Sequence, residues 1–214
     1  MVNIFLAFLL IGSTNLYGES KASATEDKTV AKEQSTSKNL EKAVFAGGCF
    51  WCMEPAFDIV KGVHKTYSGY IGGNKKNPSY EEVSSGSTGH TEALEVHYDP
   101  KVVSYRELVD VYWTTMDPTD AKGQFVDRGT QYRPGIFYYT EEQKKIAEQS
   151  KQELIDKKVF DKPIVVEITQ AGTFFPAEEY HQDYYKKNPI RYKLYRFNSG
   201  RDKFLEKFWK KKSK

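Results

Sequence analysis

The sequence predicts an α+β fold with a small mixed or antiparallel sheet. Its 214 residues are enough for one domain with a real hydrophobic core and too few to require a second domain. Short strand patterns and longer helical patterns alternate along the chain. Glycine-rich stretches at 69–73 and 84–89 separate some of these elements, so we expect prominent loops that carry the chemistry on a rigid scaffold.

The N-terminal residues indicate export. Residues 1–11 form an apolar run as long as the central region of a signal peptide, and shorter than the ~20 residues of a membrane span. Small residues at Gly18 and Ser20 would permit cleavage nearby. We therefore expect a signal peptide over 1–20, a periplasmic or secreted protein, and no stable membrane insertion after cleavage. Because no Lys or Arg precedes the run, an uncleaved membrane anchor is the alternative.

Residues 21–41 predict a disordered linker. This stretch consists mainly of Ser, Thr, Ala, Lys and Glu, with no aromatic residue and almost nothing large and apolar. Such a segment cannot bury enough surface to offset its ordering entropy. We therefore expect one folded domain over 42–214.

Composition limits the class of partner. The chain has 32 Lys and Arg against 29 Asp and Glu, and a net charge of +3 is too small to indicate nucleic acid as the main partner. Its 15 tyrosines and 13 phenylalanines predict an aromatic core and rings in the wall of any pocket. A pocket of that kind suits a small apolar group as ligand.

The first elements surround the two cysteines. The apolar run 43–46 predicts a strand, Gly47-Gly48 predicts a tight turn, and apolar residues spaced by three or four over 50–60 predict a helix. Pro55 fits only if the helix starts near Phe50, because the first four backbone donors of a helix have no internal partner. Cys49 should therefore lie at the helix N-terminus.

The rest of the chain continues the alternation of strands and helices. Hydrophobic spacing predicts strands over 63–70, 93–98, 135–139 and 164–169, helices over 105–116 and 141–158, a short helix beginning at 78–80, and a polar turn over 127–134.

The pair Cys49 and Cys52 indicates thiol chemistry. A helix N-terminus stabilises a thiolate, which is the attacking species, so Cys49 is placed to be a nucleophile. Cys52 follows by three residues and lies on the same face of a helical turn, where it can resolve an oxidised Cys49 by forming a disulfide.

Two other interpretations of the cysteine pair are weaker. A structural disulfide across so short a loop would constrain the unfolded chain little. A zinc site would need further ligands, and the four histidines show no H-x-x-H spacing, with no second cysteine pair in the chain.

The strand pattern near residue 92 places a carboxyl group toward the core. Glu92 shares its alternation with Leu94, Val96 and Tyr98, so its side chain should point to the apolar face. Apolar surroundings raise the pKa of a carboxyl group, and a protonated acid can donate to a substrate oxygen. A glutamate at the sheet edge with its charge in solvent is the alternative.

Aromatic residues lie near these groups in sequence but are ambiguous alone. Phe50 and Trp51 between the cysteines are either core residues or the wall of an apolar slot. Tyr80 and Tyr132 taken singly are more often core residues with their hydroxyl groups at the rim.

Several ordered motifs together resemble one known family over about residues 42–181. The set comprises Gly48-Cys49-Phe50-Trp51, Gly69-Tyr-Ile-Gly-Gly73, Pro78-Ser-Tyr80, Ser85-Gly-Ser-Thr-Gly-His90-Thr-Glu92, Tyr98-Asp99-Pro100, Asp117-Pro-Thr119 and Asp127-Arg-Gly-Thr-Gln-Tyr132-Arg133. It resembles the MsrA family of peptide-methionine (S)-S-oxide reductases, which repair oxidised proteins.

The resemblance implies a two-layer α+β sandwich around a ferredoxin-like plait, and a role for each matched side chain. Cys49 corresponds to the nucleophile, Glu92 to the acid that protonates the sulfoxide oxygen, and Phe50 with Trp51 to the pocket for the methyl group on sulfur. Tyr80 and Tyr132 correspond to phenols that hydrogen-bond that oxygen, and Asp127 to an acidic residue that lines the site.

The resemblance also implies the partners of the reaction. It implies no metal and no bound organic cofactor, methionine sulfoxide residues of oxidised proteins as substrate, and a thioredoxin-like reductant; we expect a monomer. Many relatives keep resolving cysteines near the C-terminus, whereas this chain has only Cys52 after Cys49. A Cys49–Cys52 disulfide is then the only intramolecular route. A general thiol-disulfide oxidoreductase and a redox-regulated binding module without turnover are the rival interpretations.

Overall fold

The structure is a computed structural model that describes residues 40–209, all within one compact unit, Asn39–Lys214. The predicted signal peptide over 1–20 and nearly all of the predicted linker over 21–41 lie outside the described residues. The first strand begins at Glu41, one residue before the predicted start of the folded domain. Among residues 40–209, no helix has the length and apolar character needed to cross a membrane.

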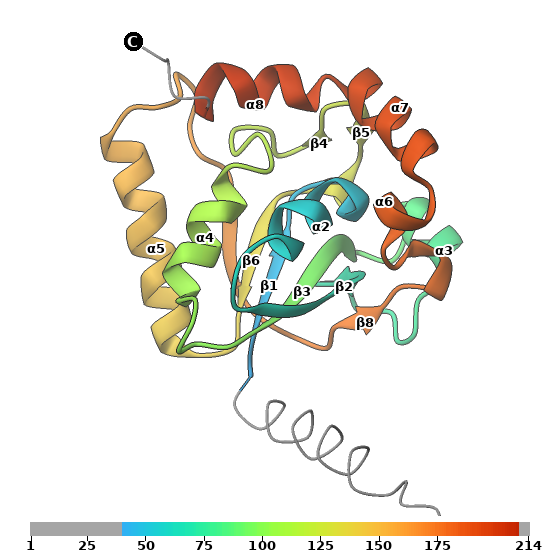
Figure 1. Cartoon of the computed structure of the whole chain (residues 1–214), viewed down its shortest axis with the longest axis horizontal. Helices are drawn as coiled ribbons and strands as arrows, with labels where there is room; N and C mark the ends of the chain where they lie inside the picture. Colours follow the sequence, from blue (N-terminus) through green and yellow to red (C-terminus); the bar gives the residue numbers. More distant parts are fainter. Residues whose placement is uncertain (1–39, 210–214) are drawn as a thin grey trace, which may run out of the picture. The chain divides into compact units, whose positions relative to one another are not determined.

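A six-stranded mixed sheet forms the centre of the domain (Figure 1), in the order β7-β6-β1-β3-β2-β8. All neighbours pair antiparallel except β6 and β7, which are parallel. The strands are β1 (Glu41–Ala46), β2 (Val63–Ile71), β3 (Thr91–Tyr98), β6 (Gly135–Tyr138), β7 (Glu167–Gln170) and β8 (Phe175–Pro176), and a separate two-stranded sheet holds β4 (Gly123–Gln124) and β5 (Asp127–Arg128).

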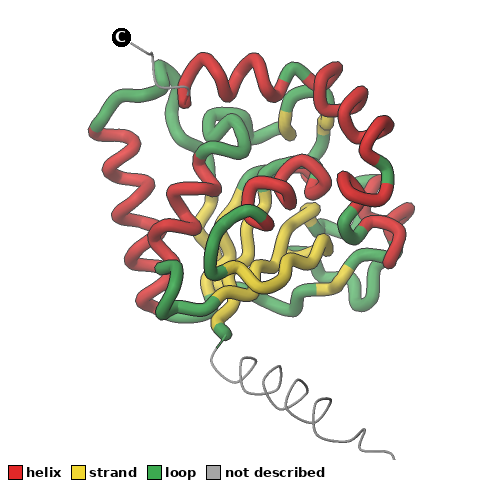
Figure 2. The backbone as a smooth tube through the Cα atoms, viewed as in Figure 1, coloured by secondary structure: helices red, strands yellow, loops and turns green. Residues whose placement is uncertain are grey.

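Helices cover one face of the sheet, which gives two layers (Figure 2). The main core lies between that face and helices α2 (Phe50–Asp58), α4 (Tyr105–Trp113) and α5 (Glu141–Asp156). A smaller apolar cluster on the other face includes Val44 and Phe137, against which Ala171 and Phe174 pack. The predicted α+β class with a small mixed sheet is confirmed.

Two predicted boundaries were wrong for identifiable reasons. The strand predicted over 164–169 begins only at Glu167, because the Val165 N–H donates to the Pro118 carbonyl instead of joining the sheet. The helix predicted over 105–116 ends at Trp113. There the hydroxyl groups of Thr114 and Thr115 donate back to helix carbonyls and compete with its continuation.

Pro55 is tolerated further inside α2 than the sequence suggested. The helix does begin at Phe50, with Cys49 as its N-cap, but Pro55 is then its sixth residue, beyond the first turn. A proline there has no N–H for the carbonyl four residues earlier, which is that of Trp51. The helix nevertheless buries Met53 and Phe57 completely, so packing stabilises it.

Three C-terminal helices were not predicted: α6 (Tyr184–Lys187), α7 (Pro189–Ser199) and α8 (Arg201–Trp209). Pro189 opens α7, where its missing N–H costs nothing, and Gly200 closes it in the left-handed region at φ 77°. In Figure 1 these helices lie beyond the N-terminal end of α2 and beside β4 and β5. They therefore cover the end of the domain where Cys49 lies.

Candidate active site

The two central strands position Cys49 and Glu92, the predicted nucleophile and acid. β1 pairs with β3 so that Phe45 stands opposite Leu94, and the turn that leads to Cys49 then lies next to Glu92. Gly48 forms this turn at φ 80°, and a Cβ there would approach the Gln124 Cβ to 2.5 Å. Only glycine fits this turn without strain. The sheet therefore fixes Cys49 and Glu92 side by side.

Both cysteines are free thiols and both are buried, with Cys49 5% and Cys52 2% exposed. Their side chains hydrogen-bond each other, and the Cys52 N–H donates to the Cys49 carbonyl at 3.0 Å. The structure thus brings together the two sulfurs that the sequence assigned to attack and resolution. They are in position to form a disulfide with each other.

The acidities of the two thiols differ from the sequence expectation. Burial raises the pKa of Cys49 well above its usual value, and the hydrogen bond to Cys52 and the Glu92 carboxylate act in the same direction. The helix N-terminus does not offset these effects in the resting enzyme. The hydrogen bond from Cys49 lowers the pKa of Cys52 to about 7, helped by the positive charges of Arg201 and Arg196. Cys52 is the more acidic thiol before substrate binds.

Glu92 is a buried acid beside Cys49. Its side chain is 3% exposed, and Oε2 accepts a hydrogen bond from the backbone N–H of Phe50, the first residue of α2, at 3.1 Å. Burial raises the pKa of Glu92 to about 8; the Phe50 hydrogen bond lowers it, and the nearby Asp127 charge raises it. The carboxyl group therefore retains its proton at neutral pH and is placed to act as a donor.

Tyr80 and Tyr132 stand at the rim of the same site, and both are half-buried. Burial, together with the charges of Glu92 and Cys49, raises the pKa of Tyr80 to about 12. Burial and the Glu92 charge likewise raise the pKa of Tyr132. Both side chains therefore stay phenols and remain hydrogen-bond donors. Tyr80 is held by its own N–H, which donates to a Glu178 carboxylate oxygen at 2.8 Å.

Asp127 connects the site to the C-terminal helices. It lies half-buried on β5, and its Oδ2 accepts a hydrogen bond from the Tyr195 hydroxyl group on α7. Burial raises the pKa of Asp127, whereas that hydrogen bond and the charge of Arg201 lower it. The residue therefore lies close enough to Cys49 and Glu92 to act on their pKa values, and it also holds α7 against β5.

Phe50 and Trp51 form an aromatic wall next to the nucleophile. Phe50 is buried and packs with Tyr70 and Val83. Trp51 is half-buried and stacks on Tyr184 with ring centroids 3.7 Å apart, while its Nε1–H donates to His181 Nδ1 at 3.2 Å. The two rings have fixed positions, so they can define an apolar slot beside Cys49.

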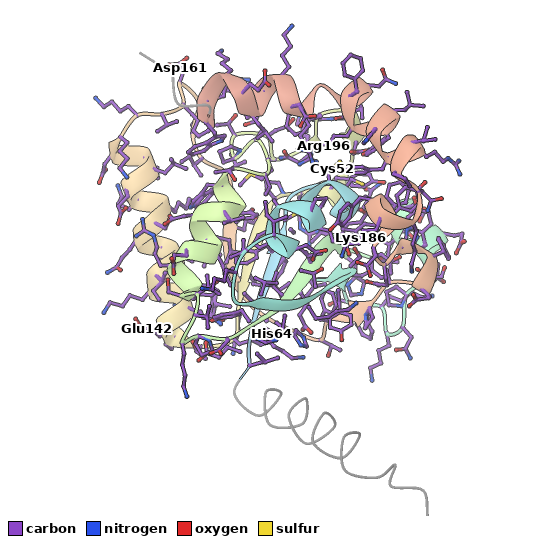
Figure 3. The ribbon with its side chains drawn as sticks, in the orientation of Figure 1. Cys52, His64, Glu142, Asp161, Lys186 and Arg196 are labelled. Carbon is purple, nitrogen blue, oxygen red and sulfur yellow. The ribbon has the colours of Figure 1, made fainter. Side chains whose placement is uncertain are left out.

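The sequence reasoning missed a set of C-terminal residues that complete the site. Arg196 donates to the Cys52 carbonyl at 2.9 Å, and Figure 3 labels the two residues next to each other. Arg201 is 1% exposed and donates to the carbonyl groups of Gly47 and Thr115. The apolar spacing over 42–181 contains no signal for these residues. The spacing of Tyr192, Tyr195, Arg196 and Ser199 along a helix is the only pattern that points to them.

His181 is a further residue at the aromatic wall that was not assigned a role. Its ring lies 5.1 Å from Phe50 and 4.4 Å from Tyr80, measured between centroids. Burial lowers its pKa, so the ring is neutral. Since Nδ1 accepts from Trp51, the ring proton is on Nε2, which has no hydrogen-bond partner among the described residues.

Comparison with known proteins agrees with this geometry. The family model for peptide methionine sulfoxide reductase matches residues 41–213. A peptide methionine sulfoxide reductase MsrA of Listeria monocytogenes serotype 4a is 58% identical over 175 residues, 82% of this chain and 99% of that protein. The protein of the same name from Bacillus licheniformis is 53% identical over 176 residues, 82% of this chain and 97% of its own.

Solved structures share the fold. The reduced form of Mxr1 from Saccharomyces cerevisiae is similar with a TM-score of 0.67 and 34% identity, covering 71% of this chain and 87% of its own. Methionine sulfoxide reductase A of Corynebacterium diphtheriae is similar with a TM-score of 0.64 and 34% identity, covering 72% of this chain and 77% of its own. The chain therefore belongs to the MsrA family of peptide methionine sulfoxide reductases and reduces methionine sulfoxide.

Proposed function

We propose that Glu92, Cys49 and Cys52 carry the reaction in this chain, as acid, nucleophile and resolving thiol. One observation supports this assignment above the others. A buried glutamate with a pKa of about 8 binds the first N–H of the helix whose N-cap is Cys49, and Cys52 hydrogen-bonds Cys49 from the next turn. An acid, a nucleophile and a second thiol thus meet in one buried site.

The first step transfers oxygen from the substrate to Cys49. Glu92 donates its proton to the sulfoxide oxygen, which makes the substrate sulfur electrophilic, and the Cys49 thiolate attacks. The sulfur–oxygen bond of the substrate breaks and a sulfur–oxygen bond to Cys49 forms, so methionine leaves and Cys49 becomes a sulfenic acid. The hydroxyl groups of Tyr80 and Tyr132 hydrogen-bond the oxygen during this transfer.

The aromatic wall selects the epimer. The sulfoxide sulfur carries an oxygen, a methyl group and the rest of the methionine side chain. Fixed contacts to these groups distinguish the two epimers at sulfur. Phe50 and Trp51 contact the methyl group, and Glu92 and the two tyrosine hydroxyl groups hydrogen-bond the oxygen. The rest of the methionine side chain points out of the site. Only one epimer then presents its sulfur to Cys49, and the family resemblance implies that it is the S-epimer.

The second step resolves the oxidised nucleophile. The Cys52 thiolate, favoured by its pKa of about 7, attacks the Cys49 sulfur, and hydroxide leaves as water after it takes a proton. A Cys49–Cys52 disulfide results. A dithiol reductant of the thioredoxin class then reduces this disulfide by exchange and becomes a disulfide itself, which closes the two-electron balance.

Single-turnover chemistry tests the two cysteines. Without reductant, wild type should form about one methionine per enzyme and lose both thiols to an internal disulfide. Cys49→Ser should form none. Cys52→Ser should still form its single methionine but keep a sulfenic acid on Cys49, which a sulfenate-specific reagent captures, and it should turn over poorly with thioredoxin.

Two outcomes would contradict the assignment. A general thiol-disulfide oxidoreductase would form no methionine in any of the three proteins, and it would reduce insulin with no sulfoxide present. If Cys52→Ser cycles with thioredoxin as fast as wild type, the reductant acts directly on the sulfenic acid. Cys52 would then have no role in turnover.

We also propose that the enzyme works outside the cytoplasm. The proposal is supported by the apolar run over 1–11 and the polar stretch after it, both outside the described residues. Fractionation of the source cells should find the protein, shortened at its N-terminus, in the periplasm or the medium. Full-length chain in the cytoplasm would disprove export, and full-length chain in the membrane fraction would favour the uncleaved anchor.

A further inference from the structure

The two faces of helix α7 differ in what they contact. Its inner face carries Tyr192, Tyr195 and Arg196, which contact the redox site. Its outer face carries Ile190, Leu194 and Phe197, which are 77%, 59% and 81% exposed. Spacings of four and three residues align these three side chains in one ridge, directly opposite the inner face. This ridge, named the α7 ridge below, therefore faces away from the redox site.

The α7 ridge is unusual for a surface helix. An amphipathic helix normally turns its large apolar side chains toward the core, and contiguous exposed apolar patches mark interaction sites. Phe197 and Ile190 are among the three most exposed large apolar residues of the described chain, and the third, Ile59, is the C-cap residue of α2. Exposed Arg191 and Lys193 flank the ridge on its two sides.

Charge identifies the partner of the α7 ridge. Residues 184–214 contain 12 Lys and Arg and only two acidic residues, Asp202 and Glu206, which gives +10. Since the whole chain carries +3, residues 1–183 carry −7. One of the two acids, Asp202, is already bound to Arg196 at 2.7 Å. The apolar ridge therefore lies in a strongly basic segment.

We propose that the α7 ridge and its basic flanks, Arg191 and Lys193, bind the anionic surface of a phospholipid membrane. An apolar face flanked by Lys and Arg is the arrangement of helices that lie in the membrane interface. Their apolar side chains enter the headgroup boundary and their cations meet lipid phosphates. The 11 residues of α7 span about 16 Å, so the helix lies along the surface and does not cross it.

Two other occupants fit the observations less well. A reductant bound to the outer face would have the whole helix, about 10 Å across, between its thiol and Cys52, and disulfide exchange requires direct attack. A second copy of the chain would bring the exposed cations Arg191 and Lys193 of the two copies together, and like charges repel. An anionic membrane neutralises the segment and covers the ridge at the same time.

Vesicle co-sedimentation of the full-length chain tests the proposal. We expect the wild type to bind vesicles with about one third phosphatidylglycerol at least tenfold more tightly than pure phosphatidylcholine vesicles, and to lose binding as salt rises from about 0.1 M to about 0.5 M. The triple variant Ile190→Ser, Leu194→Ser, Phe197→Ser should lose about tenfold or more in affinity for the anionic vesicles. The double variant Arg191→Gln, Lys193→Gln should lose about tenfold as well.

Matched controls separate this binding from misfolding and from the apolar N-terminal run. Ile59→Ser removes an equally exposed apolar side chain from the end of α2, outside the ridge, and should bind like wild type. All variants should reduce free methionine sulfoxide at the wild-type rate, because the ridge faces away from Cys49. Equal vesicle binding by wild type and the triple variant would overturn the proposal. Slow turnover of that variant with thioredoxin would then assign the ridge to the reductant, and a wild-type dimer that dissociates in the variant would assign it to a second copy.

Discussion

At the residue scale, Glu92 and Cys49 depend on each other. Each is buried, and burial raises the pKa of both. Two anions in this site would repel, so at neutral pH the pair retains at least one proton. In the resting enzyme both groups hold their protons, so Glu92 gives its proton to the sulfoxide oxygen and the resulting carboxylate takes the thiol proton as Cys49 attacks. The reaction then needs no proton from solvent in its first step.

Replacement of the acid should slow the oxygen transfer. Glu92→Gln keeps the shape and can still accept from the Phe50 N–H, but an amide donates no proton. We expect methionine formation in a single turnover to slow by roughly 10²–10⁴. In wild type the rate should fall as pH rises through about 8, where Glu92 loses its proton, and this decline should be absent in the variant. Rapid-quench assays from about pH 6 to about pH 10 measure both effects.

Glu95 supplies the matched control for this prediction. It lies on the same strand but faces away from Cys49, where it binds Lys42, His97 and Tyr139. Glu95→Gln should keep the wild-type rate and the wild-type decline at high pH. A normal rate in Glu92→Gln would exclude Glu92 as the proton donor.

At the element scale, the β1–turn–α2 unit was predictable because its signals are local. An apolar run, two glycines and three-to-four spacing fixed the strand, the turn and the start of the helix. The alternation in β3 likewise placed Glu92 on the face of Leu94 and Val96, as the structure shows. Local patterns were sufficient where one face of an element is apolar and buried.

Helix α7 was not predicted because its regular apolar spacing lies on the exposed face and its polar residues lie on the buried face. Its most regular apolar spacing is Ile190, Leu194 and Phe197, which points to solvent. The buried face is formed by Tyr192, Tyr195 and Arg196, whose polar groups bind Asp127 and the Cys52 carbonyl. A hydrophobicity pattern would have turned this helix the wrong way. The contacts that fix it come from residues more than 60 positions away and are not visible in local sequence.

The same contacts explain the error in thiol acidity. The sequence shows that Cys49 heads a helix, which favours a thiolate. It does not show that Glu92 and Asp127 lie beside Cys49 while Arg196 and Arg201 lie beside Cys52. These four charges come from β3, β5 and the C-terminal helices. Only the tertiary fold determines which sulfur is the more acidic.

At the scale of the whole molecule, the site is built on the central strands β1 and β3 and is covered by the C-terminal helices. β1 and β3 are the two central strands of the six, so the nucleophile and the acid stand on the best-supported part of the sheet. The C-terminal helices bury Cys52 through Tyr184 and Tyr192. Cys52, the proposed resolving thiol, is therefore shielded by residues that follow the domain core in sequence.

A second buried carboxyl group couples the stability of the whole domain to pH. Glu54 on α2 is 1% exposed; its Oε1 accepts from the Asp183 N–H at 3.0 Å, and its Oε2 has no partner among the described residues. Burial raises its pKa from 4.5 to about 7, although the Asp183 hydrogen bond acts in the opposite direction. The folded state therefore holds a proton that the unfolded state releases between these two values. Stability from this group is complete below pH 4.5 and is lost as pH rises to about 7.

Glu54→Gln should remove this pH dependence, because an amide does not ionise. The free energy of unfolding of wild type should fall relative to the variant by at most about 1.4 kcal/mol per pH unit, and by on the order of 3 kcal/mol in total. Urea unfolding followed by tryptophan fluorescence, with reductant present, measures the free energies of unfolding of wild type and of the variant from about pH 4.5 to about pH 8. Glu148 is an exposed glutamate on α5. The free energy of unfolding of Glu148→Gln should therefore follow that of wild type with a constant difference at every pH. Since any packing defect in Glu54→Gln would shift its curve equally at every pH, a constant offset from wild type would show that Glu54 does not take up a proton on folding.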